Sequence, residues 1–146
     1  PGHLCNHVCY QYFDILFTGD HVMEWSTSVI SPPEGEISQF IHSCKEINKL
    51  QCQKFYPGHG HPVENPNGRI AELIEHRKER ELEILNFLKS KEATISQITK
   101  SVYLNIDKEL LSVASRNVRA HLIDLIINKQ VKVDNISSDN AIYSLI

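Results

Sequence analysis

The sequence predicts an α/β fold with helices packed on a sheet, followed by a small second domain. Three observations support this fold class. Strand-like runs alternate with helical patterns from residue 8 to residue 88. Turn residues such as Gly, Pro and Asn separate these runs. After Ala93 the pattern changes to helices followed by two alternating strands. This order is typical of helices laid on a mixed or parallel sheet, with a separate helical module behind it.

The pattern in the first part of the chain predicts six elements, one of which is a turn. Two short strands lie between residues 8 and 17, broken at Phe13-Asp14. The next elements are a helix over 36–50, a strand over 54–56, a turn over 65–68 and a helix over 69–88. The helices are assigned from apolar residues that recur at helical spacing, such as the stripe of the first helix that ends at Leu50. The strands are assigned from short apolar runs that end in Gly or Pro.

The second part of the chain predicts a winged-helix arrangement. Thr94 and Gln97 form a capping box that opens a helix. A second helix covers 109–128, with Leu110 on its buried side. Strands over 131–133 and 142–145 form a wing around a turn from Asp134 to Asn140. From Glu92 onward the basic and acidic residues balance, which gives no strong signal for DNA binding. We therefore predict domains over 1–91 and 92–146, the second with a structural or partner-contacting role.

Composition limits the class of protein. At 146 residues with 41% hydrophobic and 23% charged residues, the chain is one ordinary globular domain or two small ones. It has no apolar run near the roughly 20 residues of a membrane span and no signal-peptide pattern. The four cysteines form no CxxC pair, which favours a reduced, cytoplasmic protein, and their even number leaves disulfides as the alternative. Because the chain begins at Pro1 and not at methionine, we expect a piece of a longer protein.

Three polar residues lie on Gly-flanked loops at strand ends. Asp20 ends the second strand in Phe-Thr-Gly-Asp, and His3 and His59 each follow a Pro-Gly pair. Taken singly, each is a common turn residue, but the repeated Pro-Gly-His indicates one polar cluster. Imidazole nitrogen and carboxylate oxygen suit zinc, and also iron or manganese. Cys5 is a weaker alternative ligand.

Two other stretches have both a structural and a functional interpretation. The long segment after Asp20 carries Trp25, which lines a substrate pocket or packs as a lid on the core. The mixed-charge run 76–81 is typical of a solvated helix face. In the alternative, Arg77 or Arg80 braces the loops above the site.

These residues together resemble a known family. Pro-Gly-His at His3, Phe-Thr-Gly-Asp at Asp20, Tyr-Pro-Gly-His-Gly at His59 and His-Arg-Lys-Glu-Arg-Glu over 76–81 look like the C-terminal half of a metallo-β-lactamase superfamily enzyme. The branch it resembles has an appended winged helix and includes β-lactamase-like hydrolases and endoribonucleases acting on single-stranded RNA. The resemblance implies an αββα sandwich with two metal ions, usually zinc.

The resemblance also implies roles for individual residues. His3 would bind the first metal, His59 the second, and Asp20 would bridge both as the catalytic carboxylate, with His7 a weaker candidate near the site. The metals would activate water to cleave an ester, thioester, lactam or phosphodiester bond in a small molecule or RNA.

One part of the family pattern is missing. The His-x-His-x-Asp-His motif, which supplies the other ligands in relatives, does not occur in this chain. We therefore expect this piece to be inactive alone, with an exposed apolar sheet face that favours self-association. The alternative function is a catalytically inactive interaction module whose winged helix contacts a protein partner or RNA.

Overall fold

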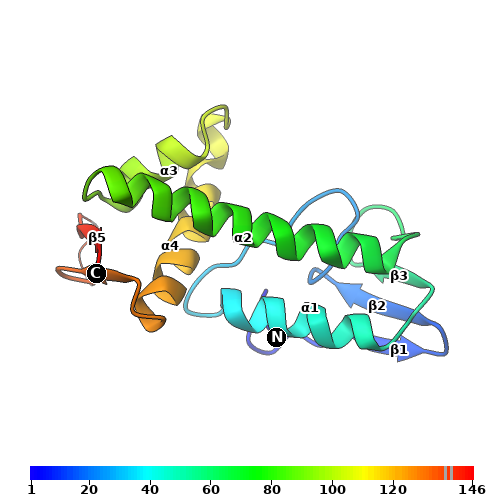
Figure 1. The fold of residues 1–146 in the computed structure, drawn as a ribbon. Coiled ribbons are helices and arrows are strands. Elements are labelled where there is room, and N and C mark those ends of the chain that lie inside the picture. Colours follow the sequence, from blue (N-terminus) through cyan, green and yellow to red (C-terminus); the bar gives the residue numbers. More distant parts are fainter. Residues whose placement is uncertain (137, 139) are drawn as a thin grey trace. The chain divides into compact units, whose positions relative to one another are not determined.

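The computed structural model of the chain describes residues 1–136, 138 and 140–146. The chain divides into two compact units, Pro1–Arg77 and Lys78–Ile146 (Figure 1). The predicted domain boundary between residues 91 and 92 stays a prediction. Among the described residues, no helix is both long and apolar enough to cross a membrane.

A three-stranded sheet forms the first unit's framework. Its strands are β1 (Tyr10–Tyr12), β2 (Ile15–Gly19) and β3 (Lys54–Pro57), in the order β1-β2-β3. β1 and β2 are antiparallel, whereas β2 and β3 are parallel. The predicted strand pair and third strand are confirmed. The chain reverses at Phe13, whose φ of 51° places it in the left-handed region.

The helix α1 (Ile37–Lys49) connects β2 to β3 and confirms the predicted helix over 36–50. A parallel strand pair requires a crossover connection of this kind. Its apolar stripe is buried at Ile37, Phe40, Cys44 and Ile47. Leu50, predicted on the same stripe, is 43% exposed because the helix ends at Lys49.

The helix α2 (Pro66–Ser90) begins earlier than predicted. The turn expected over 65–68 is wrong, because Pro66 to Gly68 form the first helical turn. The Gly68 N–H donates to Asn65 Oδ1 at 3.1 Å, so Asn65 caps the helix. Asn before a helix and Pro at its first position are both favourable, and this pair resembles a turn when read without its context.

The two faces of the sheet differ in burial. Leu16 and Phe55 are each 1% exposed and point into the core of the first unit. The opposite face carries an aromatic row, because Tyr10 pairs with Phe17 and Phe17 pairs with Tyr56. These three side chains are 69%, 48% and 36% exposed. The predicted exposed apolar face is therefore present, on an aromatic row that crosses all three strands.

The second unit has the predicted winged-helix order. Its elements are α3 (Ile95–Val102), a 3-10 turn η1 (Lys108–Leu110), α4 (Leu111–Ile127), β4 (Val131–Val133) and β5 (Tyr143–Leu145). The capping box of Thr94 and Gln97 is confirmed in both directions. Ile98, Val118, Leu122 and Leu125 are fully buried in its core.

Two details of the second unit differ from the prediction or lie beyond it. The helix expected over 109–128 starts with the 3-10 turn η1, and Leu110, expected in the core, is 50% exposed. In the wing, the predicted turn from Asp134 to Asn140 includes Ser137 and Asp139, which lie outside the described residues.

Candidate metal centre

Asp20 and His59 meet at one edge of the sheet. β2 and β3 are parallel neighbours, so their C-terminal ends lie together, and Gly19 pairs with Pro57. The residues that follow these ends bring His59 Nε2 to 3.5 Å from Asp20 Oδ1. Two of the three predicted site residues are therefore in contact, and both side chains keep access to solvent.

Gly58 makes this approach possible. A Cβ atom at Gly58 would lie 2.6 Å from Asp20 Oδ1, which is closer than real Cβ contacts allow. The strand end therefore needs glycine for steric reasons, so that the Asp20 carboxylate can lie against the main chain that leads to His59.

His3 is oriented by a main-chain contact. Its Nδ1 lies 2.8 Å from the oxygen of Val29, a contact that requires the proton on Nδ1 and leaves the lone pair on Nε2. Metal-binding imidazoles commonly donate their second ring N–H to a carbonyl in this way. His3 also contacts His7, with ring centroids 5.9 Å apart.

Two further imidazoles, His7 and His21, follow His3 in a row of neighbouring rings. The His7 ring is 5.6 Å from the His21 ring, and His21 is 1% exposed against Phe40. Burial lowers the pKa of His7, helped by His3 and opposed by Asp20. Burial also lowers the pKa of His21 to about 3. These two imidazoles are therefore neutral at physiological pH and do not repel a cation.

The donor set fits a metal ion in kind but not in number. His3, Asp20 and His59 supply the nitrogen and oxygen atoms that zinc binds in proteins. A catalytic zinc ion usually has three protein ligands and a water. In residues 1–136, 138 and 140–146, no group of three or more His, Cys, Asp or Glu side chains is arranged to hold a metal. Cys5, the weaker candidate, is an exposed free thiol.

The segment after Asp20 is fastened through main-chain oxygens. Ser28 Oγ donates to the main-chain oxygens of Asp20 and His21. Arg77 Nη2 in turn donates to the main-chain oxygen of Ser28, and Arg77 is itself 1% exposed. This chain of contacts connects α2 to the residue that carries the candidate carboxylate. Of the two interpretations of the charged run, the bracing role therefore holds for Arg77.

Arg80 does not share that role. Its Nη1 donates to the Val102 oxygen at 2.8 Å, and its guanidinium lies 4.1 Å from the centre of the Tyr103 ring. These contacts belong to the second unit. Arg80 is thus a structural residue of the winged-helix part.

Arg69 fastens the same segment at a second point. Its Nε donates to the Met23 oxygen and its Nη2 to the Ser26 oxygen, each at 2.8 Å. Its Nη1 lies 3.1 Å from Glu72 Oε2. The sequence interpretation missed Arg69 and Ser28 because no local pattern distinguishes them from ordinary helix and loop residues.

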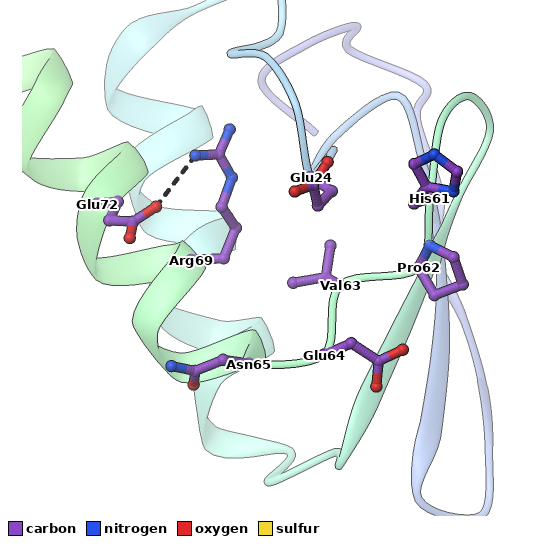
Figure 2. A pocket seen from close by; sticks show the side chains of 8 residues that line it. All are labelled: Glu24, His61, Pro62, Val63, Glu64, Asn65, Arg69 and Glu72. Atoms are coloured by element: carbon purple, nitrogen blue, oxygen red, sulfur yellow. Dashed lines mark hydrogen bonds and ion pairs between the residues drawn. The ribbon is translucent and has the colours of Figure 1, made fainter.

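A cavity of about 600 Å³ lies beside this segment (Figure 2). Its lining includes Glu24, His61, Glu64, Arg69 and Glu72. Glu72 is paired with Arg69, and Glu64 with Lys54 at 2.9 Å. Neither Asp20 nor His59 lines this cavity. The cavity and the Asp20–His59 pair are close along the chain, because His61, which lines the cavity, follows His59 by two residues.

The comparisons with known proteins agree with this fold. The family model described as the Beta-lactamase associated winged helix domain matches residues 94–137. A protein named Beta-lactamase-like protein 2 homolog from Drosophila melanogaster is 30% identical over 98% of this chain and 49% of its own length. A protein of the same name from Caenorhabditis elegans is 31% identical over 82% of this chain and 40% of its own length. The chain thus spans about half the length of these curated relatives or less.

Other matches extend the comparison. An Aspergillus fumigatus protein named Atrochrysone carboxyl ACP thioesterase is 31% identical over 58% of this chain and 26% of its own length. The crystal structure of a metallo-beta-lactamase family protein from Thermus thermophilus matches with a TM-score of 0.84. It is 21% identical, and the match covers 100% of this chain and 47% of that one. At this identity the structural match supports the fold alone.

Fold, sequence relatives and the winged-helix match define the class. The chain belongs to the metallo-β-lactamase superfamily. Within that superfamily it is a protein with the associated winged-helix domain, and its α/β part corresponds to the C-terminal half of the αββα sandwich.

Proposed function

We propose that this chain supplies part of the metal centre of a zinc-dependent hydrolase. The contact between Asp20 and His59 at the shared end of two parallel strands is the observation that supports this most. The Nδ1 contact of His3 supports the same role, because it leaves Nε2 available to a metal. The sequence relatives support a hydrolase, since one of them is named a thioesterase.

The roles of the residues follow from their donor atoms. His3 would offer Nε2, His59 would offer Nε2, and Asp20 would offer carboxylate oxygens to a shared centre. A bound zinc ion would lower the pKa of water and supply a hydroxide nucleophile near neutral pH. Residues Ser28 and Arg77 hold the main chain at Asp20 and so limit its movement. The remaining ligands would come from outside this chain.

The proposed reaction is hydrolysis of an ester-like bond, with a thioester as the first substrate class to test. Lactams and phosphodiesters are the other classes that such a centre can cleave, because both need only an activated water and a stabilised oxyanion. Iron and manganese remain the alternative metals for the same donors.

Bound metal is the decisive measurement. The protein is dialysed exhaustively, and zinc, iron and manganese are measured per chain for the wild type, Asp20→Ala and Asp14→Ala. Asp14 is an exposed carboxylate at the opposite end of β2 and serves as the matched control. We expect metal in the wild type and Asp14→Ala and loss in Asp20→Ala. A wild type without metal would contradict a metal site held by this chain.

Activity is then measured in a longer protein that contains this chain and supplies the remaining ligands, with a thioester, an ester, a lactam and a phosphodiester as substrates. Loss of hydrolysis in both Asp20→Ala and His59→Ala, with full activity in Asp14→Ala, is the expected pattern. Equal activity in all four proteins would show that the reaction does not use this centre.

A second candidate function is an interaction module. A small cavity of about 180 Å³ in the second unit is lined by Arg116, Arg119, Ser96 and Ser115. Two arginines beside hydroxyl groups suit a phosphate of RNA. Binding of single-stranded RNA that weakens with salt, and that is lost in Arg116→Ala but kept in Asp20→Ala, would favour this function.

A further inference from the structure

Trp25 is an exposed aromatic residue in a segment whose aliphatic residues on either side of it are buried. Its side chain is 66% exposed, whereas Val22 and Ile30 on either side of it are fully buried and Ser28 is 1% exposed. It is also the only tryptophan in the sequence. Of the two interpretations made from the sequence, packing as a lid on the core is therefore wrong.

The backbone that carries Trp25 is held on both sides by one guanidinium group. Arg69 donates to the oxygen of Met23, just before Glu24-Trp25, and to the oxygen of Ser26, just after it. Arg69 is largely buried and its third nitrogen pairs with Glu72. The exposure of Trp25 is thus not a sign of a loose loop, since the two peptide groups that flank it are fixed from α2.

The indole lies against the loop that carries His59. A Cβ atom at Gly60 would lie 2.5 Å from Trp25 Cδ1 and 2.8 Å from Nε1. Gly60 also has a φ of +83°, which other residues rarely adopt. One edge of the indole therefore rests on the residue next to His59, while much of the ring stays open to solvent.

We propose that Trp25 is a specificity-determining residue, and that its exposed indole contacts a planar, apolar acyl group of the substrate. This inference rests on the proposed hydrolase function. An aromatic ring that is fixed beforehand binds another flat apolar group with little additional loss of conformational entropy. Because the ring lies against Gly60, the residue after His59, a group bound to it would lie beside the loop that carries His59. Glu24, the neighbouring residue, lines the cavity of Figure 2.

The first test is binding and does not require turnover. Trp25 fluorescence in the Asp20→Ala protein is followed during titration with S-benzoyl-N-acetylcysteamine and S-acetyl-N-acetylcysteamine. Free N-acetyltryptophanamide corrects for collisional quenching and absorption by the probe. We expect a saturable change with the benzoyl probe and about tenfold weaker binding of the acetyl probe, from the apolar area of one ring. A change no larger than that of the free indole would overturn the inference.

The second test is selectivity in the longer, metal-loaded protein that contains this chain and supplies the remaining ligands. The ratio of kcat/KM for the benzoyl over the acetyl thioester is measured for the wild type, Trp25→Phe, Trp25→Ala and Tyr12→Ala. Tyr12 is a matched control, because it is 63% exposed but lies on β1, where it pairs with the start of β2. We expect the ratio to fall about tenfold in Trp25→Ala, to recover largely in Trp25→Phe and to be unchanged in Tyr12→Ala.

The two proposals fail in different ways. Hydrolysis with an unchanged ratio in Trp25→Ala would overturn the role of Trp25 and leave the hydrolase intact. Saturable binding of the benzoyl probe, without hydrolysis of any probe by the longer metal-loaded protein, would overturn the hydrolase and support recognition by Trp25. The absence of both saturable binding and hydrolysis would overturn both.

Discussion

Arg77 donates a hydrogen bond to the main-chain oxygen of Ser28, and both residues are almost completely shielded from solvent. Ser28 passes this restraint on, because its hydroxyl donates to the main-chain oxygen of Asp20. A residue on α2 therefore restrains the backbone of the candidate metal ligand through a single intermediate.

Replacing Arg77 should loosen this region. Arg77→Met removes the donor and leaves the buried Ser28 oxygen without it, which costs about 1–3 kcal/mol in the free energy of unfolding. We expect a lower urea midpoint, measured by Trp25 fluorescence, and a shifted Trp25 emission maximum in the folded protein. Arg80→Met is the control: it also removes a bond to a carbonyl, but in the second unit, so the emission of Trp25 should not move. An unchanged Trp25 signal in Arg77→Met would contradict the restraint.

A methyl group at Gly58 should act on the metal and not on the fold. The added Cβ would lie 2.6 Å from Asp20 Oδ1, so Gly58→Ala forces the carboxylate to move. We expect metal affinity, measured by competition with a chelator, to fall about tenfold or more, since loss of one well-placed ligand contact is of that order. Gly60→Ala is the companion variant, because its Cβ meets Trp25 instead. Equal metal affinity in wild type and Gly58→Ala would exclude this position for the metal.

The capping box of α3 should contribute measurably to the second unit. Thr94 Oγ1 accepts from the Gln97 N–H, and the Gln97 side chain accepts from the Thr94 N–H. Thr94→Ala should cost about 1 kcal/mol in the free energy of unfolding. Thermal unfolding followed by circular dichroism measures this change. Ser96→Ala, an exposed site in the same helix, should change the stability by less than half as much. Similar losses in both variants would argue against the cap.

Glu81 should make the second unit less stable as the pH rises. Burial raises the pKa of Glu81, and the carboxylate of Asp124 raises it further. Between the ordinary value of 4.5 and the raised value, the folded state binds more protons than the unfolded state. The free energy of unfolding therefore falls as the pH increases through this window.

The measurement is urea unfolding by circular dichroism at a series of pH values that rises from the ordinary value of 4.5. Glu81→Gln should flatten the pH dependence, because its side chain cannot ionise. Glu79→Gln, on an exposed part of the same helix, should retain the wild-type dependence. If the wild type gained stability relative to Glu81→Gln as the pH rises, the raised pKa of Glu81 would be contradicted.

The aromatic row on the sheet should promote self-association of this chain. Tyr10, Phe17 and Tyr56 lie side by side across three strands and are all exposed or nearly so. Sedimentation velocity should show dimers or larger species that dissociate in Phe17→Thr. Leu104→Thr, a change of an 81% exposed residue in the second unit, should leave the association unchanged. A wild type that is monomeric at every concentration would refute this role of the row.

The fold was largely predictable because its signals are local. Strand runs, the α1 stripe and the Thr94 capping box each lie within a few residues of sequence, and all were found where predicted. The start of α2 was misjudged because Asn-Pro is common both in turns and at helix starts. Only the hydrogen bond from the Gly68 N–H to Asn65 Oδ1 distinguishes the two. Leu110 was misjudged because it lies in the 3-10 turn η1 and not in α4, so the α-helical spacing does not apply to it.

The site was predictable only in part. Asp20 and His59 could be paired from the strands that carry them, because parallel neighbours end at one edge. The restraints on the loop could not, because Arg69 and Arg77 bind main-chain oxygens that are 43 to 49 residues away in sequence. Such contacts place no requirement on the residue type at the acceptor position, so the sequence around Met23, Ser26 and Ser28 carries no sign of them.

That independence has a consequence for how this protein can change. Because Arg69 and Arg77 recognise peptide oxygens, exchanges at Glu24, Trp25 and Thr27 leave the hydrogen bonds that hold the segment in place. A directed-evolution library at these three positions could therefore alter substrate preference while the hydrogen bonds from Arg69 and Arg77 are kept.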